Sequence, residues 1–312
     1  MYTIKEAAAR TGLSVPVLRA WERRYGVVTP QRTPGGYRVY DEAALRRLRS
    51  MRRLIDDGWS ASAAAAAIIA GTEPAAGHAA EGAGDATAGD RAGVLVEELL
   101  NAAETLDSQR IEVVLDDMFA AGTYERVAEE YVIPSLRAIG DAWSAGRVAV
   151  AGEHVVSNAV LRRLAASFQA SGPGRDGGRP VLVGMPPGAR HELGGLIFAT
   201  ALRRRGIPVI YLGADLPLDD WIAAMDRTDA QAVVIGAVMP ADTPMARSVA
   251  AGLRAARPEV IIAFGGVAAP DPDAGMGSSA TTIRLPDELR DAVEVLVAAL
   301  PGTPKRGTGR RS

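Results

Sequence analysis

The sequence of 312 residues contains no cysteine. Disulfide bonds, thiolate metal sites and cysteine nucleophiles are therefore excluded together. Aromatic residues make up 5% of the chain and there are only three histidines, so each histidine is a candidate for a specific role. No run approaches ~18 apolar residues and no basic-then-apolar leader is present, so we expect neither a membrane span nor a secretory signal. These absences favour a cytoplasmic protein.

Basic residues are concentrated at the N-terminus, although the whole chain has a net charge of only −2. Residues 1–53 hold twelve basic and four acidic residues, a net charge of +8, so the rest of the chain carries −10. A basic module attached to an acidic body indicates that this end of the chain binds a polyanion.

The basic region begins with two short helices. Thr3 is a plausible N-cap for a helix over residues 4–11, which Gly12 ends, and Ser14 caps a second helix over residues 15–25. Two helices joined by a short glycine-containing turn are the signature of a helix-turn-helix, whose second helix enters the major groove of DNA.

A glycine-rich stretch over residues 26–40 follows, with strand-like pieces that end at Tyr37–Tyr40, and it is typical of a wing. Asp41 then caps a third, arginine-rich helix. We interpret the arginines of this helix in part as a solvated face; they are Arg46, Arg47, Arg49, Arg52 and Arg53.

The segment LRAWERRYGVVTPQRTPGGYRVYDEAAL resembles the N-terminal winged helix of MerR-type regulators, over about the first 70 residues. The resemblance implies binding to double-stranded operator DNA. The residues it assigns to DNA contact are Arg19, Arg23, Arg24, Arg32, Tyr37 and Arg38. Typical members continue into one long dimerising coiled coil, whereas this chain has a short alanine-rich helix at 61–70, so we expect any dimerisation to come from elsewhere.

The middle of the chain is expected to be helical. Residues 71–93 are rich in glycine, alanine and acidic residues without periodicity, which indicates a flexible linker. Over residues 94–170 apolar residues recur at helical spacing in four segments, which predicts a four-helix bundle. Pro134 falls inside the third of these helices.

Trp143 ends the third helix, and Glu153 and His154 begin the fourth. Taken alone, this arrangement favours a core tryptophan beside a capping pair, although an aromatic plate near an acid and an imidazole could also cover a flat ligand. The spacing W-x-x-G-x-x-x-V-x-x-E-H is similar to the bundle motif of light-responsive MerR-type repressors of the CarH kind. That resemblance implies that Trp143, Glu153 and His154 cover the upper face of adenosylcobalamin. Ser144 stands where the best-known members have a histidine that ligates cobalt after illumination.

Residues 179–300 alternate between strand-like and helical patterns, and 301–312 form a basic tail that we expect to be disordered. The expected strands are Val181–Gly184, 209–212, 232–237, 260–264 and 281–284. Five strands joined by crossover helices predict a parallel α/β sheet of flavodoxin-like (Rossmann-like) order. The whole chain is therefore predicted to be multidomain: an α-helical winged helix-turn-helix, a central bundle and an α/β domain.

His191 follows the first of these strands, on a Pro-Pro-Gly loop that leads to a helix beginning with Gly194 and Gly195. Ligands bind outside the carboxyl ends of strands in open α/β sheets, so His191 is at a ligand-facing position unless it is an ordinary polar loop residue. A dinucleotide site is disfavoured because no G-x-G-x-x-G lies in register, whereas imidazole suits a cobalt-class metal.

The order His191-x-x-Gly194, Ala237-x-Met239 and Gly265-Gly266 resembles the cobalamin-binding pattern D-x-H-x-x-G, S-x-L and G-G. The resemblance implies that His191 is the lower cobalt ligand. It also implies a slot for the nucleotide tail, lined by Gly194, Ala237, Gly265 and Gly266. Ala189 replaces the carboxylate that usually bonds the histidine, and loss of such a partner weakens affinity or activity ~10–100-fold. Ala237 replaces the usual serine.

Together these resemblances imply a DNA-binding transcriptional repressor, not an enzyme, that senses light through adenosylcobalamin. Illumination would change the state of a homo-oligomer, a dimer or a tetramer, and release DNA. A first alternative is a MerR-type regulator whose altered pocket binds no cobalamin or another tetrapyrrole. A second is a cobalamin-carrying methyltransferase module, which is disfavoured because the chain has no room for a substrate barrel.

Overall fold

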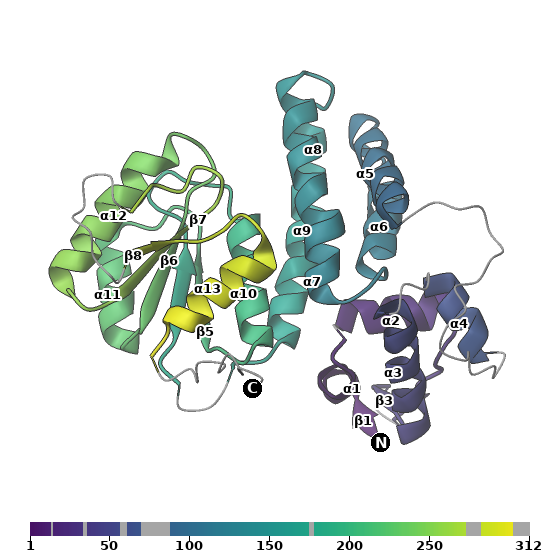
Figure 1. Cartoon of the computed structure of the whole chain (residues 1–312). Coiled ribbons are helices and arrows are strands. Elements are labelled where there is room, and N and C mark those ends of the chain that lie inside the picture. The colour runs from purple at the N-terminus through teal and green to yellow at the C-terminus, as the bar shows by residue number, and fades with distance from the viewer. Residues whose placement is uncertain are drawn as a thin grey trace, which may run out of the picture. The chain divides into compact units, whose positions relative to one another are not determined.

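The computed structural model describes residues 1–13, 15–33, 36–56, 61–69, 88–174, 178–272 and 282–301. Internal contacts divide the chain into two compact units, Met1–Ser171 and Gly172–Ser312 (Figure 1). Among the described residues, no helix combines the length and the apolar character needed to cross a lipid bilayer.

The first two helices have the bounds predicted from the sequence: α1 is Ile4–Thr11 and α2 is Val15–Tyr25. Thr3 caps α1 in a reciprocal capping box with Glu6, and the backbone N–H of Thr3 holds the pKa of the Glu6 carboxyl below its usual value. Gly12 ends α1 in the left-handed conformation, with φ of 68°. Ser14, the expected cap of α2, lies outside the described residues.

A three-stranded antiparallel sheet and two further helices complete the N-terminal fold. Its strands, in the order β1-β3-β2, are β1 (Tyr2–Thr3), β3 (Arg38–Tyr40) and β2 (Gln31–Arg32). The helices are α3 (Glu42–Asp56) and α4 (Ala61–Ile69). Asp41 caps α3 by accepting from the Ala44 N–H at 2.7 Å, as predicted. The helices enclose a core built around the fully buried Leu18, Trp21 and Tyr40.

The same unit contains the four predicted bundle helices (Figure 1). They are α5 (Ala88–Glu104), α6 (Ser108–Phe119), a composite third helix and α9 (Val150–Ala170). The third helix consists of α7 (Tyr124–Val127), a π-helical segment (Ala128–Val132) and α8 (Ile133–Ser144). Pro134 falls in the first turn of α8, and the wider π turn before it accommodates a residue that lacks a backbone N–H.

α5 begins at Ala88, so residues 88–93 of the predicted linker are helical. No proline lies in this stretch to interrupt a helix, so α5 continues upstream of the amphipathic pattern.

The second unit is a five-stranded parallel sheet in the order β5-β4-β6-β7-β8, which is the predicted flavodoxin-like order. Its strands are β4 (Val181–Gly184), β5 (Val209–Gly213), β6 (Ala232–Gly236), β7 (Ile261–Gly265) and β8 (Thr282–Arg284). Its helices are α10 (Leu193–Arg204), α11 (Leu218–Thr228), α12 (Asp242–Ala256) and α13 (Leu289–Ala299). α10 and α13 cover one face of the sheet, and α11 and α12 cover the other (Figure 1).

Apolar side chains that alternate along the central strands form the core of this unit. Leu182, Val233 and Phe264 belong to one fully buried cluster with Trp221 of α11 and Val249 of α12. The chain order reverses between β4 and β6, and ligands of such sheets bind at this switch point. The loops after β4 and β6 are therefore the ones that the fold offers for binding.

Two glycines of the bundle give a matched test of its packing. A Cβ at Gly152 would lie 2.4 Å from the Ala103 carbonyl oxygen, whereas a Cβ at Gly140 would meet nothing within 4 Å. We expect Gly152→Ala to destabilise the bundle by ~1–3 kcal/mol, because α9 must move away from α5. Gly140→Ala should stabilise it by ~0.5–1 kcal/mol, because alanine is the better helix former. Urea unfolding followed by circular dichroism measures both changes, and equal effects of the two substitutions would contradict this account.

Candidate DNA interface and ligand-binding site

The arginines of the recognition helix α2 differ in their surroundings. Arg19 is exposed, and the structure gives its guanidinium no hydrogen bond among the described residues. Arg23 is also largely exposed, but it forms an ion pair with Asp116 of α6. The side chain of Arg24 lies outside the described part of the chain. Of the predicted contacts on α2, Arg19 is thus the one presented to solvent without a partner among the described residues.

The predicted wing residues lie around β2 and β3. Arg32 is exposed and donates to the Gly36 carbonyl at 3.3 Å, and Tyr37 is 76% exposed. Arg38 is half-buried, and its Nε donates to both carboxylate oxygens of Glu22 on α2, at 3.0 and 3.2 Å. Arg38 therefore fixes the wing to the recognition helix, while Arg32 and Tyr37 stand at the exposed tip.

Burial, followed by the nearby charge and hydrogen bond of Glu22, raises the pKa of Tyr40 to about 12. The Tyr40 hydroxyl donates to Glu22 at 3.3 Å, so strand β3 contacts this one carboxylate through Arg38 and through Tyr40.

Helix α2 also packs against the bundle within the first unit. The indole N–H of Trp21 donates to the Ala120 carbonyl at 3.2 Å, and Ala120 is fully buried in the same cluster as Trp21. Asp116, which pairs with Arg23, is itself held by Arg163 of α9 at 2.9 Å. Arg23 is therefore engaged with the bundle through Asp116.

The three predicted cap residues flank the short connection between α8 and α9. Trp143 is 49% exposed, which excludes the simpler interpretation of a buried core tryptophan. Gly146 adopts a φ of 74° in this connection. Arg147 holds the connection against α5 through two ion pairs, one with Glu104 and one with Glu97 at 2.6 Å. Trp143 therefore lies at an end of the bundle that these ion pairs hold in place.

Glu153 and His154 lie in the first turns of α9. The Glu153 carboxylate lies 2.5 Å from Nδ1 of His154 and accepts from the Ser157 hydroxyl at 2.5 Å. The ring of His154 remains exposed. The structure therefore places two exposed rings, indole and imidazole, on either side of one connection, and the carboxylate orients the imidazole.

In the second unit, His191 lies on the loop between β4 and α10, after the strand that borders the switch point. It is exposed, and its imidazole has no hydrogen-bond partner among the described residues. Gly194 next to it is exposed, and a Cβ there would meet no atom within 4 Å. Both predicted residues thus stand open to a ligand.

The loop that carries His191 is held by the loop between β5 and α11. The Asp215 carboxylate accepts from the Gly188 N–H at 2.6 Å, and the Asp215 N–H donates to the Ala189 carbonyl at 3.0 Å. The Leu216 N–H donates to the Met185 carbonyl at 3.1 Å. These three bonds fix the backbone before His191, although Ala189 offers no carboxylate to its ring.

Glu192, the residue after His191, is turned toward the sheet. Its carboxylate accepts from the Tyr211 hydroxyl at 2.8 Å, and its carbonyl accepts from the same hydroxyl at 3.0 Å. Burial and the neighbouring Glu192 raise the pKa of Tyr211, so this phenol stays protonated and continues to donate. The adjacent acid therefore holds the beginning of α10 in place.

The remaining predicted residues surround the ends of β6 and β7. Ala237 is fully buried, its N–H donates to the Gly265 carbonyl at 2.8 Å, and a Cβ on Gly266 would lie 2.3 Å from the Ala237 oxygen. Gly265 has open space beside it, apart from ordinary contact with Leu285. The structure thus brings the two glycines around Ala237, next to the switch point.

Several residues of these sites escaped the sequence analysis. Asp215 lies 27 residues from Gly188, and an LGAD sequence does not reveal its partner. A Cβ at Gly195 would lie 2.3 Å from Met185 Cε, so this glycine makes room for a side chain of the chain itself. The left-handed φ of 55° at Asp215 is visible only in the structure.

The substitution Asp215→Gly tests whether the Asp215 carboxylate fixes the loop that carries His191. Glycine adopts the positive φ of Asp215 without strain but removes the carboxylate. We expect amide exchange at Gly188 to accelerate at least ~10-fold, because its acceptor is lost. Hydrogen–deuterium exchange measures this rate. Asp229→Gly, at another left-handed position with φ of 48°, is the control and should leave the Gly188 rate unchanged.

Comparison with known proteins agrees with the division of the chain. Residues 2–68 match the MerR HTH family regulatory protein family, and residues 95–166 and 179–283 match two families described as B12 binding domain. The fold of the corrinoid protein for monomethylamine from Methanosarcina barkeri is similar, with a TM-score of 0.55 at 15% identity, over 67% of this chain and 99% of that one.

Two relatives from Myxococcus xanthus span most of the chain. The HTH-type transcriptional repressor CarH is 37% identical over 70% of this chain and 73% of its own length. The HTH-type transcriptional repressor CarA is 34% identical over 69% of this chain and 68% of its own. The winged helix, the exposed loop histidine and these relatives lead to one conclusion: the chain belongs to the CarH/CarA family of MerR-type transcriptional repressors with B12-binding domains.

Proposed function

We propose that this protein is a light-responsive repressor that binds adenosylcobalamin through His191 and binds operator DNA through its winged helix. The observation that carries the proposal is the exposed imidazole of His191, which has no hydrogen-bond partner among the described residues and stands on a braced loop at the switch point of the sheet. The repressors CarH and CarA and the two B12-binding matches support it.

The donor chemistry of the loop fits a corrinoid. No group of three or more His, Cys, Asp or Glu side chains that could hold a metal ion occurs among the described residues. A single imidazole would bind a bare metal ion poorly, but it would suit a metal that arrives with ring nitrogens already bound and takes one further ligand from the protein. The open backbone at Gly194 and Gly265 leaves room beside it.

The lower side of the site depends on the backbone rather than on a carboxylate partner of the ring. A carboxylate at position 189 would orient the imidazole and raise its basicity, and Ala189 cannot do so. Asp215 compensates in part, since it fixes the loop on both sides of Ala189 and limits the positions that His191 can take.

The upper side of the ligand would be covered by the end of the bundle. Trp143 offers an exposed indole for stacking, and Glu153 and His154 offer an acceptor and a donor for the polar edge of the adenosyl group. When bound, the cofactor supplies a cobalt–carbon bond that light can break. Ser144 provides no second imidazole, so a protein ligand on the upper side would have to be His154.

The proposed control of operator binding depends on multivalency. Several winged helices held in one homo-oligomer bind an operator far more tightly than one, because each further contact is intramolecular. Illumination would separate the subunits and release DNA. This role is regulatory and not enzymatic. The described residues around the histidine loop supply hydrogen bonds that fix the backbone, and Arg19, Arg32 and Tyr37 supply DNA contacts.

Substitution of His191 tests the proposal. The wild-type chain loaded with adenosylcobalamin in darkness should bind the pigment, assemble and shift operator DNA, and should lose assembly and DNA after green illumination. His191→Ala should lose axial imidazole ligation, visible as a base-off absorption spectrum, and should weaken cobalamin binding at least ~10-fold. Arg190→Ala, the exposed neighbour, is the matched control. A colourless wild-type chain that still binds DNA would instead support a regulator with another ligand.

Ala189→Asp provides the converse test. A carboxylate restored beside His191 should tighten cobalamin binding ~10–100-fold, because it would orient the imidazole. Ala189 is buried, so the unpaired acid should also lower the melting temperature of the cobalamin-free chain, and cobalamin should recover it. An absorbance titration gives the affinity, and an unchanged dissociation constant would contradict the assigned geometry.

A further inference from the structure

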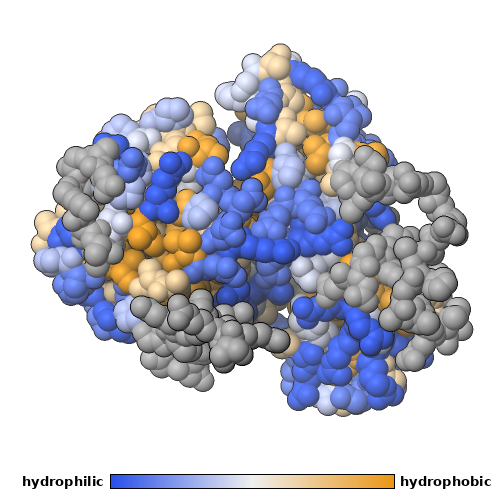
Figure 2. Space-filling view, in the orientation of Figure 1, coloured by the Kyte–Doolittle hydropathy of each residue, from blue (hydrophilic) through white to orange (hydrophobic). Residues whose placement is uncertain are grey.

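The side chain of Met185 is buried between two glycines at the carboxyl end of the parallel sheet. Apolar residues appear on the visible surface of the second unit (Figure 2), but Met185, which directly follows β4, is only 1% exposed. A Cβ on Gly195, in the first turn of α10, would lie 2.3 Å from Met185 Cε. A Cβ on Gly236, the last residue of β6, would lie 2.4 Å from Met185 Sδ. The thioether therefore fills a space that exists because both positions lack a side chain.

The alternation of side chains along β4 determines the face of the sheet on which Met185 lies. Leu182 belongs to the same buried cluster as Trp221 of α11, and a Cβ on Gly184 would lie 3.0 Å from the ring of Trp221. Since successive side chains of a strand point to opposite faces, Met185 points to the other face, which α10 and α13 cover (Figure 1). Its position against Gly195 of α10 agrees with this assignment.

The two glycines around the thioether are the direct neighbours of residues that are expected to bind the ligand. Gly195 follows Gly194 in α10, and Gly236 ends β6 immediately before Ala237. The resemblance to cobalamin-binding proteins assigns Gly194 and Ala237 to the slot for the nucleotide tail. Strands β4 and β6 also border the switch point of the sheet. Met185 thus occupies space between the beginning of α10 and the end of β6, the two elements that carry this predicted slot.

The backbone of Met185 is fixed, whereas its side chain can adopt other rotamers. The Met185 N–H donates to the Gly213 carbonyl at 2.9 Å, and the Met185 carbonyl accepts from the Leu216 N–H at 3.1 Å. Methionine is unbranched and has three rotatable side-chain bonds, so it adapts its shape more readily than other apolar residues. The thioether can therefore leave the space between the glycines while the bonds that hold the loop of His191 stay in place.

We propose that Met185 determines which corrinoids the chain accepts, because its thioether fills the slot for the nucleotide tail and must rotate out of it when the tail binds. The inference rests on the proposed cobalamin binding and deepens it. A corrinoid without a nucleotide would leave Met185 in place. Displacement of a buried side chain costs free energy, so Met185 lowers the affinity for cobalamin without lowering the affinity for the corrin ring alone.

Removal of the thioether tests this assignment. The wild-type chain and Met185→Ala are titrated in darkness with adenosylcobalamin and with adenosylcobinamide, which has the corrin ring but no nucleotide. We expect Met185→Ala to bind adenosylcobalamin at least ~10-fold more tightly, because no buried side chain has to be displaced. Its affinity for adenosylcobinamide should be unchanged. Absorbance titrations give both dissociation constants.

Met225→Ala is the matched control, because Met225 is a fully buried methionine of the same unit and lies on α11, at the opposite face of the sheet. It removes the same atoms and should leave both affinities unchanged. Urea unfolding of each variant without ligand separates a loss of folding from a change in binding. An equal gain for both corrinoids in Met185→Ala, no gain, or the same gain in Met225→Ala would overturn the inference, since Met185 would then be an ordinary core residue.

A second measurement needs no destabilising substitution. In the wild-type chain, isotope-labelled at its methionine methyl groups, the Met185 methyl should show nuclear Overhauser effects to the α-protons of Gly195 and Gly236. Adenosylcobalamin should abolish these effects and adenosylcobinamide should preserve them, and effects that persist with adenosylcobalamin bound would overturn the inference. If the wild-type chain binds neither corrinoid, the proposed function fails, and the inference then stands only if Met185→Ala binds adenosylcobalamin.

Discussion

The ligand site depends on one set of hydrogen bonds, which join the loop after β5 to the loop after β4. Asp215 contributes through its carboxylate to Gly188 and through its N–H to Ala189, and Leu216 adds a bond to Met185. A loop with a Pro-Pro-Gly sequence has few backbone donors of its own, so the neighbouring strand must brace it. The same bonds fix the backbone before His191. The sheet therefore limits the positions of the imidazole, even though no carboxylate lies beside the ring.

Much of the fold could be predicted because capping residues and the apolar pattern of the sequence indicate the same helices and strands that the structure contains. Thr3 and Gly12 mark both ends of α1 through capping chemistry, and strands separated by helical segments give the order of the parallel sheet. The exposed histidine at a strand end followed from the same reasoning. The start of α5 differs from the predicted one because residues 88–93 contain no apolar periodicity that would mark them as helix.

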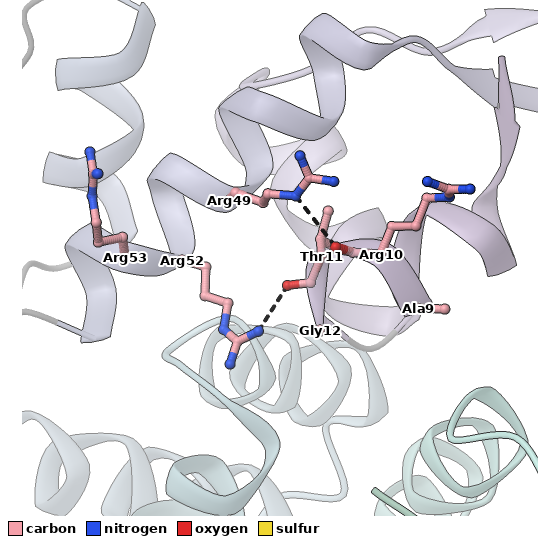
Figure 3. A pocket seen from close by; sticks show the side chains of 7 residues that line it. All are labelled: Ala9, Arg10, Thr11, Gly12, Arg49, Arg52 and Arg53. Atoms are coloured by element: carbon pink, nitrogen blue, oxygen red, sulfur yellow. Dashed lines mark hydrogen bonds between the residues drawn. The ribbon is translucent and has the colours of Figure 1, made fainter. Parts of the chain in front are cut away.

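The rest of the candidate sites arises from contacts distant in sequence. Asp215 acquires its role only when β5 pairs with β4, and Gly195 only when Met185 packs against it. Arg49, Arg52 and Arg53 of α3 look like part of a solvated face in sequence, whereas the structure places them beside the end of α1 (Figure 3). Arg38 pairs with Glu22, and no regularly spaced motif in the sequence predicts this contact.

The contacts between the DNA-binding helices and the bundle combine apolar packing with polar bonds, since α2 packs against α6 and α9 and Ala120 is buried in the same cluster as Trp21. They include the Trp21 indole bond, the exposed Arg23–Asp116 pair and a bond from Arg126 to the Ile55 carbonyl at 3.3 Å. An exposed ion pair contributes ~0–1 kcal/mol and a neutral hydrogen bond ~1 kcal/mol, so the Arg23–Asp116 pair is the weakest of these contacts, and the buried apolar packing around Trp21 adds to the others. In the proposed function, a DNA phosphate that binds Arg23 has to displace only this exposed ion pair and not the buried packing of Trp21.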